Sequence, residues 1–490
     1  MNWRTLLGAK RQEEIDIPPD MAKYPTSEFE QDYWRIVNSA PFRRLQDKTQ
    51  VFPLDKSDFV RTRLTHSVET SALAKQLTTM ATANIIRYQK DTPYAITEEQ
   101  AKEAANAAMC AGLLHDIGNP PFGHFGEVVI GAWFQENLGK LSYKGSALDQ
   151  LFDTKMTNDL YHFEGNAQAL RLLTKVYHVD GSCGMNLTPA VLHTLVKYPV
   201  DSSSFHPKDP DIKRHKPGYF QAEEEQFRQM ARQCGTEMDG TVQRHPLTYI
   251  LEAADDIAYA TADLEDAYKK GLFTLDDFIT FYWDTLAQNR ERWALTPQQE
   301  EKSGDLIRRL EDLRREYGGM EAFQRWIAYA RHWLMYTAAF GFTPYGSHKD
   351  NTYADIMEGR FQQEIISRTY HGGSIRILKA AMGEFVYQSP GILTLELAAQ
   401  TILSSLLSRF APAVIYMDAD DGTSEEYRPT PSQRKLIRLL SDSQLACYQR
   451  EKTGEPVRDL YLRMLLVTDF ISGMTDSYAK NLYQELAGIY

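Results

Sequence analysis

Two histidines and two carboxylates lie within the short stretch HDIGNPPFGHFGE (115–127). The preceding segment, AANAAMCAGLL, is rich in helix formers, so we expect His115 and Asp116 at the C-terminal end of a helix that Gly118 and Pro120 close. Imidazole and carboxylate side chains hold divalent metals and transfer protons. The stretch therefore predicts reactive groups that are anchored to a helix and followed by a rigid turn.

A further histidine, His66 in RLTHS, lies near the start of a helix predicted over 67–88. With His115 and Asp116 it would supply the mixed nitrogen and oxygen ligands that suit a transition metal or magnesium. A single histidine in a helix is more often a structural residue. A histidine beside an aspartate at a Gly–Pro break is a rarer pattern, and it favours a metal site.

A fourth ligand is expected from the acidic helix EAADDIAYATADLEDA (252–267). Asp255, Tyr259 and Asp263 are four residues apart and would share one face, whereas Asp256 would point about 100° away. Asp255 is therefore the better candidate if Tyr259 and Asp263 also face the site. The alternative is an ordinary acidic helix surface, but the many alanines make this helix too apolar for full exposure. Burying its carboxylates would be costly without nearby cations, and a metal would supply that compensation.

The overall composition limits the class of function. The net charge is −12, from 54 basic and 66 acidic residues, which opposes general polyanion binding, so a phosphate-bearing ligand needs a local basic pocket. The four cysteines lie far apart without a C-x-x-C pair, which argues against a disulfide framework or a zinc knuckle. Because neither a signal peptide nor an apolar run of membrane-spanning length is evident, we expect a soluble, cytoplasmic protein.

Helical periodicity dominates the chain, and we predict an all-α fold. A boundary at 285–304 would separate a first part, 1–285, from a helical C-terminal part, 286–490. Polar segments at 139–160 and 200–225 are typical of loops or lids, and YHVDGSCGMNLT fits a hairpin around Asp180–Gly181. Helices are predicted within the segments 27–46, 67–88, 101–115, 164–177, 246–271, 298–317, 354–386, 394–409 and 458–488.

Two of these helices have predicted buried faces. In the first, Ser27 and Glu30 have capping-box spacing, and Tyr33, Ile36 and Val37 form the apolar face before Pro41 interrupts. In the helix over 67–88, the residues predicted to be buried are Val68, Leu73, Leu77 and Ile85.

The combination of His66, His115, Asp116 and Asp255 resembles the HD-domain phosphohydrolase superfamily, and NPPFGHFGE looks like its deoxynucleoside triphosphate triphosphohydrolases. The match is close to the bacterial deoxyguanosine triphosphate triphosphohydrolases. The HD pair alone is weak evidence, but an ordered set over roughly residues 35–270 is highly specific. That set is RRLQDKTQVFPL, RTRLTHS, GLLHDIGNPPFGHFGE, FEGNAQALRLL, LVKYP and EAADDIAYATADLEDA.

The resemblance implies an HD-domain helical core with loop insertions over 1–285 and a mostly helical part over 286–490 that completes the nucleotide pocket and the oligomer contacts. Members of the family hydrolyse a deoxynucleoside triphosphate to the deoxynucleoside and inorganic triphosphate, with attack at the α-phosphorus. One divalent metal ion per subunit is implied, with manganese or magnesium favoured and iron or cobalt compatible. Its implied ligands are His66, His115, Asp116 and Asp255.

The 5′ oxygen of the sugar is a poor leaving group and benefits from a proton donor. The resemblance assigns this role to His124, because imidazole titrates near the working pH. Glu127, three residues on, would orient His124 and raise its pKa. The alternative is that both residues only cap backbone groups of the turn.

Contacts with each part of the nucleotide are also implied. Cations would meet the phosphates, an aromatic ring and a carboxylate would contact the deoxyribose and exclude a 2′ hydroxyl, and an amide would read the guanine edge. The assigned residues are Arg63, Lys197 and, as a weaker third, Lys379 for the phosphates, Tyr259 and Asp263 for the sugar, and Gln50, Val51, Tyr387 and Gln388 for the base. Each base contact could equally be structural, a lone basic residue is usually part of a solvated helix face, and His162 ranks low as a phosphate contact.

Two other classes of function stay open at this point. One is a catalytically weak, nucleotide-responsive regulatory protein, against which the paired His124 and Glu127 argue. The other is an HD phosphodiesterase or nucleotidase that acts on other nucleotides. The family resemblance also suggests a homo-oligomer, often a hexamer, with single-stranded DNA as a conceivable effector and no membrane partner.

Overall fold

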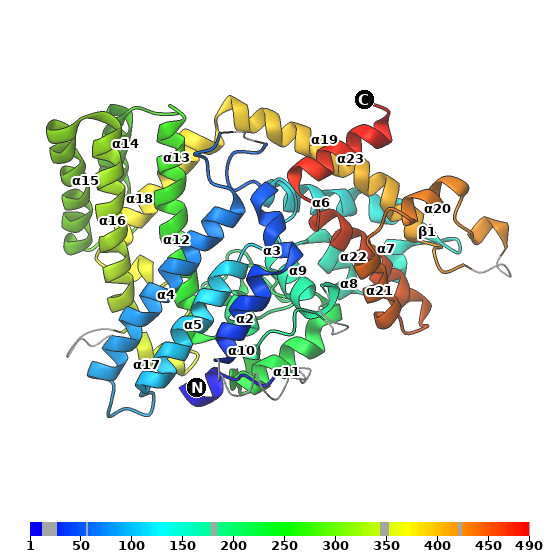
Figure 1. Cartoon of the computed structure of the whole chain (residues 1–490), viewed down its shortest axis with the longest axis horizontal. Coiled ribbons are helices and arrows are strands. Elements are labelled where there is room, and N and C mark those ends of the chain that lie inside the picture. Colours follow the sequence, from blue (N-terminus) through cyan, green and yellow to red (C-terminus); the bar gives the residue numbers. More distant parts are fainter. Residues whose placement is uncertain (12–26, 55–56, 178–183, 344–351, 420–423, 490) are drawn as a thin grey trace.

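The computed structural model describes residues 1–11, 27–54, 57–177, 184–343, 352–419 and 424–489 (Figure 1). The helices dominate the regular structure of these ranges, whose strands form only the two-stranded hairpins β1–β2 and β3–β4, which confirms the predicted all-α class. The strands are β1 (Ser142–Tyr143), β2 (Ser146–Ala147), β3 (Glu237–Met238) and β4 (Thr241–Val242). The helices are α1 (Trp3–Leu6), α2 (Glu28–Val37), α3 (Ala40–Arg44), η2 (Leu45–Asp47), α4 (Arg63–Tyr88), α5 (Glu98–Leu114), α6 (Gly123–Asn137), η3 (Leu138–Lys140), α7 (Leu148–Leu151), α8 (Thr154–Tyr161), α9 (Gly165–Arg171), η4 (Leu172–Val176), α10 (Pro189–Leu195), η5 (Ile212–Arg214), η6 (Gln221–Glu223), α11 (Glu224–Cys234), α12 (Pro246–Ala258), η7 (Tyr259–Asp263), α13 (Leu264–Lys269), α14 (Leu275–Asn289), α15 (Pro297–Tyr317), α16 (Gly319–Phe342), α17 (Thr352–Met357), η8 (Ile366–Arg368), α18 (Gly372–Met382), η9 (Gly383–Tyr387), α19 (Pro390–Val414), η10 (Glu425–Tyr427), α20 (Pro431–Ile437), α21 (Asp442–Glu451), α22 (Pro456–Ser472) and α23 (Asp476–Ala487).

The centre of the molecule is a bundle in which α4 packs against α5 and α12 (Figure 1). Thr62 and Thr97 begin α4 and α5 with side-chain caps, so both helices have defined starts. The two helices approach closely at Gly112, where an added Cβ would lie 2.5 Å from the Cα of Ser71. The bundle fixes the relative positions of the N-terminal end of α4, the C-terminal end of α5 and the middle of α12.

Two apolar clusters make up the core. The first joins the central bundle to α14, α15, α16 and α18, and it continues across residue 285 from Ala254 of α12 to Trp326 of α16. The second joins α6 and α8 to the C-terminal helices α19, α22 and α23. The predicted division of the chain at residue 285 stays a prediction.

Two predicted buried faces need correction. Val68 is 51% exposed, because the inner face of α4 runs through small polar residues on either side of it, such as Ser67 and Thr70. Tyr33 is 39% exposed, whereas α2 buries Phe29 and, as predicted, Ile36. Val68 and Tyr33 each lie just outside the buried face of their helix. The sequence pattern alone did not distinguish such edge positions from buried ones.

Some predicted element boundaries also change. The segment 139–160, predicted as a loop or lid, contains β1, β2, α7 and α8, because Asp153 caps α8 at the Met156 amide and Leu148 and Leu160 are buried. The helical stretch predicted over 354–386 is broken after α17, where Gly359 has a φ of 75°. The segment 200–225 is mostly irregular, as predicted. The hairpin predicted around Asp180–Gly181 lies outside the described residues.

Among the described helices, α19 alone is long and apolar enough to cross a membrane, by length and composition only. Such a helix is weak evidence, since core helices of water-soluble proteins meet the same criterion. One face of α19, which includes Leu403, Leu406 and Phe410, is buried in the second apolar cluster. The helix packs there against α6, α20, α22 and α23.

Candidate active site

A cavity of about 670 Å³ lies where the central bundle meets α6 and the start of α19. It collects most of the residues that the sequence singled out, from segments that are far apart along the chain. The predicted site residues that line it are Gln50, Val51, Arg63, His66, His115, Asp116, His124, Glu127, Lys197, Asp255, Tyr259 and Tyr387.

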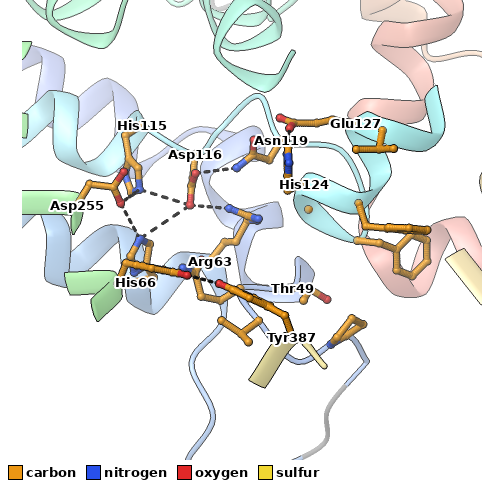
Figure 2. Close-up of a pocket in the computed structure, with 18 of the residues that line it drawn as sticks. Thr49, Arg63, His66, His115, Asp116, Asn119, His124, Glu127, Asp255 and Tyr387 are labelled. Atoms are coloured by element: carbon orange, nitrogen blue, oxygen red, sulfur yellow. Dashed lines mark hydrogen bonds and ion pairs between the residues drawn. The ribbon is translucent and has the colours of Figure 1, made fainter. Parts of the chain in front are cut away.

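The four predicted metal ligands converge on one side of this cavity (Figure 2). The Nε2 atoms of His66 and His115 lie 3.2 Å and 3.3 Å from Oδ1 of Asp255. The same two nitrogens lie 4.0 Å and 3.4 Å from Oδ2 of Asp116. His66, His115 and Asp116 by themselves place one ligand atom each within 4.8 Å of one another, a spacing that a single cation can bridge.

The environment of His115 matches that of a metal ligand. Its Nδ1 lies 2.8 Å from the carbonyl oxygen of Gly112, so this nitrogen carries a proton and Nε2 faces the cluster. That buried Nε2 has no hydrogen-bond partner in the described structure. Burial lowers the pKa of His115, but Asp116 and Asp255 outweigh it and raise the pKa to about 10. A bound cation would satisfy both the nitrogen and the two carboxylates, so the residues present fit a divalent metal.

The predicted register of the acidic helix α12 agrees with the structure. Asp255 faces the two histidines, whereas the Asp256 carboxylate pairs with Lys379 at 2.8 Å. Lys379 is not among the described residues that line the cavity, and it also lies 3.9 Å from Glu364. Lys379 therefore neutralises Asp256, and its predicted contact with the phosphates gains no support from this geometry.

Two cations pair with the carboxylates of the cluster, which the sequence did not predict. Arg63 donates to Oδ2 of Asp116 at 2.6 Å, and Lys197 donates to Oδ2 of Asp255 at 2.8 Å. Burial raises the pKa of each carboxyl group, but these cations and the two histidines reverse the effect and hold both pKa values well below the usual range. Asn119 also donates to Asp116, at 2.7 Å.

Arg63 connects the four predicted metal ligands, called the metal-type cluster below, to the turn that carries His124. Its Nη1 donates to Asp116. Its Nη2 packs against Gly123, where an added Cβ would lie only 2.6 Å from this nitrogen. The buried Nε of Arg63 has no hydrogen-bond partner in the described structure. Figure 2 shows the guanidinium group between the cluster and His124. A cation with an unused donor at this place is suited to an anionic ligand that spans the two groups.

His124 and Glu127 form the pair that the sequence predicted, on the first turns of α6. The Nδ1 of His124 lies 2.6 Å from Oε2 of Glu127, and the hydrogen bond to Glu127 is the main cause that raises the pKa of His124. The other oxygen of Glu127 accepts from the backbone amide of Gly165 at 2.8 Å, which fixes the carboxylate. The side chain of His124 is 75% exposed, so its Nε2 is free to meet a ligand.

Tyr259 and Tyr387 close another side of the cavity, with their hydroxyl groups hydrogen-bonded to each other. Burial raises the pKa of Tyr259 to about 12, so its hydroxyl stays protonated. Tyr259 begins the π-helical turn η7, in which the spacing of four residues no longer places Asp263 directly beneath it. Asp263 is buried beside Gln50, whose amide nitrogen lies 3.5 Å from its Oδ2, and it does not line the cavity.

The remaining predicted residues lie at the margin or elsewhere. Gln388 ends the turn η9 and is exposed outside the residues that line the cavity. His162 is exposed, and its ring packs against Phe205 with 4.9 Å between ring centroids. Neither residue therefore gains support for the substrate contact predicted for it.

The sequence analysis missed several polar residues of the cavity wall, among them Glu164, Asn166 and Lys216. Glu164 and Asn166 belong to the FEGNAQ block, and Lys216 lies in the segment predicted as a loop or lid. Lys216 pairs with Glu164 at 2.9 Å, and Glu164 accepts from Asn166 at 2.7 Å. Glu164 and Asn166 belong to a block that carries the family resemblance but gave no reason to assign them a role, and a lysine in a polar loop such as Lys216 is common on surfaces without a function.

Comparisons with known proteins identify relatives over the full length of the chain. A family model described as HD domain matches residues 63–146. The chain is 42% identical over 493 residues to a deoxyguanosinetriphosphate triphosphohydrolase-like protein of Listeria monocytogenes, which covers 100% of both chains. A protein of the same name from Synechocystis is 32% identical over 500 residues, again over 100% of both. A deoxyguanosinetriphosphate triphosphohydrolase of Yersinia pestis is 32% identical over 507 residues and 94% of each chain.

Proposed function

Because this chain belongs to the HD-domain family of deoxyguanosinetriphosphate triphosphohydrolases and triphosphohydrolase-like proteins, we propose that it hydrolyses dGTP, and in addition other deoxynucleoside triphosphates, to the deoxynucleoside and inorganic triphosphate. One observation carries the proposal. A single cavity holds the His66–His115–Asp116–Asp255 cluster and the His124–Glu127 pair, with Arg63 between them. Phosphoryl transfer needs a cation, a positioned phosphate and a proton donor together.

The metal is proposed to be one divalent ion per subunit, held by His66, His115, Asp116 and Asp255. When bound, such an ion polarises an α-phosphate oxygen and makes a coordinated water more acidic. The ligand set suits manganese or magnesium, and also iron or cobalt. The hydrogen bond from His115 to Gly112 and that from Asn119 to Asp116 keep two of the ligands oriented.

The phosphates are proposed to meet Arg63 and Lys197. Both cations border the metal-type cluster, and their partners Asp116 and Asp255 would share charge with the metal. The Nε of Arg63, which has no hydrogen-bond partner in the described structure, and its Nη2 would then be available to donate to the phosphate oxygens. Lys216, on the wall near His124, is a further cation within the same cavity.

The proton for the leaving group is proposed to come from His124. The oxygen of water forms the new bond to the α-phosphorus while the bond from phosphorus to the 5′ oxygen breaks, and Nε2 of the His124 imidazolium protonates that oxygen. Glu127 accepts from Nδ1 of His124, so it stabilises the protonated ring and aims Nε2 into the cavity. The attacking water releases its own proton to solvent, from which His124 is reprotonated, so the sum of the step is the addition of one water across the bond from phosphorus to the 5′ oxygen.

The nucleoside is proposed to lie between the tyrosine pair and the segment of Gln50 and Val51. Tyr259 and Tyr387 provide a hydrogen-bonded aromatic wall, which would pack against the deoxyribose and oppose a 2′ hydroxyl group. Gln50 offers an amide that can donate and accept in one plane, as the guanine edge requires, and its Oε1 has no hydrogen-bond partner in the described structure. Asp263 beside Gln50 supports the position of that amide.

The other two classes of function fit this cavity less well. A regulatory protein without turnover has no need of the buried Glu127 that orients His124. A monophosphate or a cyclic nucleotide would use few of the three cations on the wall, Arg63, Lys197 and Lys216. Assembly into a homo-oligomer such as a hexamer and an effect of single-stranded DNA stay predictions from the family resemblance, and a cytoplasmic location stays a prediction from the composition of the chain.

A product assay tests the proposal. The purified chain is incubated with each of the four deoxynucleoside triphosphates and a divalent metal, with ribonucleotides as controls, and the products are separated by ion exchange. We expect deoxyguanosine and triphosphate from dGTP and little from GTP. Release of the monophosphate and pyrophosphate would contradict the mechanism, and the absence of any product would favour the regulatory alternative.

A further inference from the structure

The last helix of the chain reaches the cavity wall through one buried carboxylate. Asp476, the first residue of α23, is 2% exposed. Its Oδ1 accepts a hydrogen bond from the backbone amide of Phe122 at 2.9 Å. Its Oδ2 accepts from the backbone amide of Thr49 at 3.0 Å and from the hydroxyl group of the same residue. One side chain thus joins two cavity-lining segments that are far apart in sequence.

The two segments have different places in the site. Thr49 directly precedes Gln50 and Val51, the wall proposed to meet the nucleobase. Phe122 directly precedes Gly123 and His124, the turn that carries the proposed proton donor. Phe122 has a φ of 63°, a left-handed conformation that a residue with a side chain keeps only when surrounding contacts hold it. The hydrogen bond to Asp476 is such a contact.

Neighbouring residues reinforce the same attachment. The buried Lys48 donates to the carbonyl oxygen of Ser472 at 2.7 Å and to that of Asn119 at 2.6 Å, so it also links the α22–α23 junction to both segments. Ser477 donates to Asp47 at 2.8 Å. The α23 helix itself is held by α19, which it contacts at the top of Figure 1. The helix that carries Asp476 is therefore a packed part of the fold.

We propose that Asp476 is a positioning residue that holds the base wall, Thr49 to Val51, in register with the turn that carries His124. The inference rests on the proposed function, because it gives Asp476 a part in aligning the two ends of one nucleotide. Hydrogen bonds to a carboxylate are stronger than those between neutral groups, so one side chain can fix both walls. Misplacement of a reacting group by about 1 Å can cost about 100-fold in rate.

The first test replaces Asp476 with asparagine. The single amide oxygen of asparagine cannot serve both walls, and its NH2 group faces a donor. We expect Asp476→Asn to lower kcat/KM for dGTP about 10- to 100-fold and to weaken the preference for dGTP over dATP. The matched control is Asp442→Asn, which changes the exposed first residue of α21 and leaves kcat/KM within about twofold.

A second pair of variants separates the two walls. Thr49→Val removes only the hydroxyl bond to Asp476 on the base side, so we expect KM to rise several-fold with kcat largely retained. Thr49→Ser keeps the hydroxyl group, so we expect its KM to equal that of the wild type. This pair decides the matter if Asp476→Asn fails to fold, because equal KM values in Thr49→Val and the wild type would then overturn the proposal.

Hydrogen exchange supplies a readout that does not depend on turnover. Pro120 and Pro121 have no amide hydrogen, so a peptide over 119–124 reports few amides, among them that of Phe122. We expect this peptide to exchange faster in Asp476→Asn than in the wild type or in Asp442→Asn. Unchanged exchange would overturn the proposal whatever the kinetics. If the wild type released no triphosphate, the proposed function would fail, while the exchange result would still decide whether Asp476 holds the turn.

Discussion

Arg63 donates a hydrogen bond to Asp116 at 2.6 Å, so a residue proposed to bind phosphate is coupled to a proposed metal ligand. A lysine at this position could form one contact but not the planar set of donors that reaches both Asp116 and the phosphates. We expect Arg63→Lys to lower kcat/KM for dGTP about 10- to 100-fold, which corresponds to about 1.4 to 2.8 kcal/mol, while metal content stays unchanged. Steady-state kinetics and elemental analysis check this. Arg87→Lys, at the exposed end of the same helix, is the control, and an equal loss in it would contradict the assignment.

The metal assignment predicts different effects for adjacent aspartates. Asp255→Asn removes a carboxylate that faces both histidines, so we expect loss of bound metal and of activity together. Asp256→Asn disturbs only the pair with Lys379, so metal content should remain near one ion per subunit. Elemental analysis of both proteins after identical purification makes the comparison. A chelator should abolish activity in the wild type and added manganese should restore it. Equal metal content in the two variants would refute the assigned register.

The pair His124 and Glu127 predicts a pH dependence. The hydrogen bond to Glu127 raises the pKa of His124, and a proton donor works only when protonated, so activity should persist above the ordinary histidine pKa of about 6.5 and fall as pH rises further. Glu127→Gln removes the charged partner, and the alkaline limb of the kcat profile should move to lower pH. His124→Ala should keep its metal and lose about 100- to 10,000-fold in kcat. Near-normal kcat in His124→Ala would show that another group supplies the proton.

Two buried histidines away from the cavity predict a loss of stability in acid. Burial lowers the pKa of His193 to about 4 and that of His245 to about 3, so both are neutral in the folded protein at pH 6. Below about pH 6.5 the unfolded chain binds these protons and the folded protein does not. The free energy of unfolding should therefore decrease as the pH is lowered from about 6.5 to about 4. The slope should be about 1.4 kcal/mol per pH unit for each histidine. Denaturant titrations at pH 7 and pH 5 measure it, and His193→Gln should reduce the slope.

Local sequence rules predicted the parts of the site that local structure determines. His115 ends α5, because a turn that contains Gly118 and Pro120 follows it, and Asp255 faces the histidines because α12 is regular as far as Ala258. The π-helical turn η7 was not predicted, since a single inserted residue leaves the pattern of apolar residues almost unchanged.

Contacts between distant segments could not be predicted from the sequence. The ion pair of Lys197 with Asp255 and the hydrogen bonds of Asp476 join residues that only the packing of helices brings together. Lys197 and Asp476 are single charged residues, and composition and periodicity gave no reason to place Lys197 beside Asp255 or Asp476 beside Phe122. The family resemblance supplied the residues of the cavity, but not the partners that hold them in place.

The central claim is that water attacks the α-phosphorus and that the 5′ oxygen leaves with a proton from His124. The most direct measurement is hydrolysis of dGTP in water enriched in heavy oxygen, followed by mass spectrometry of both products. The account predicts that the label enters triphosphate and that deoxyguanosine remains unlabelled, because the bond from phosphorus to the 5′ oxygen is the one that breaks. Label in deoxyguanosine, or release of dGMP with pyrophosphate, would contradict it.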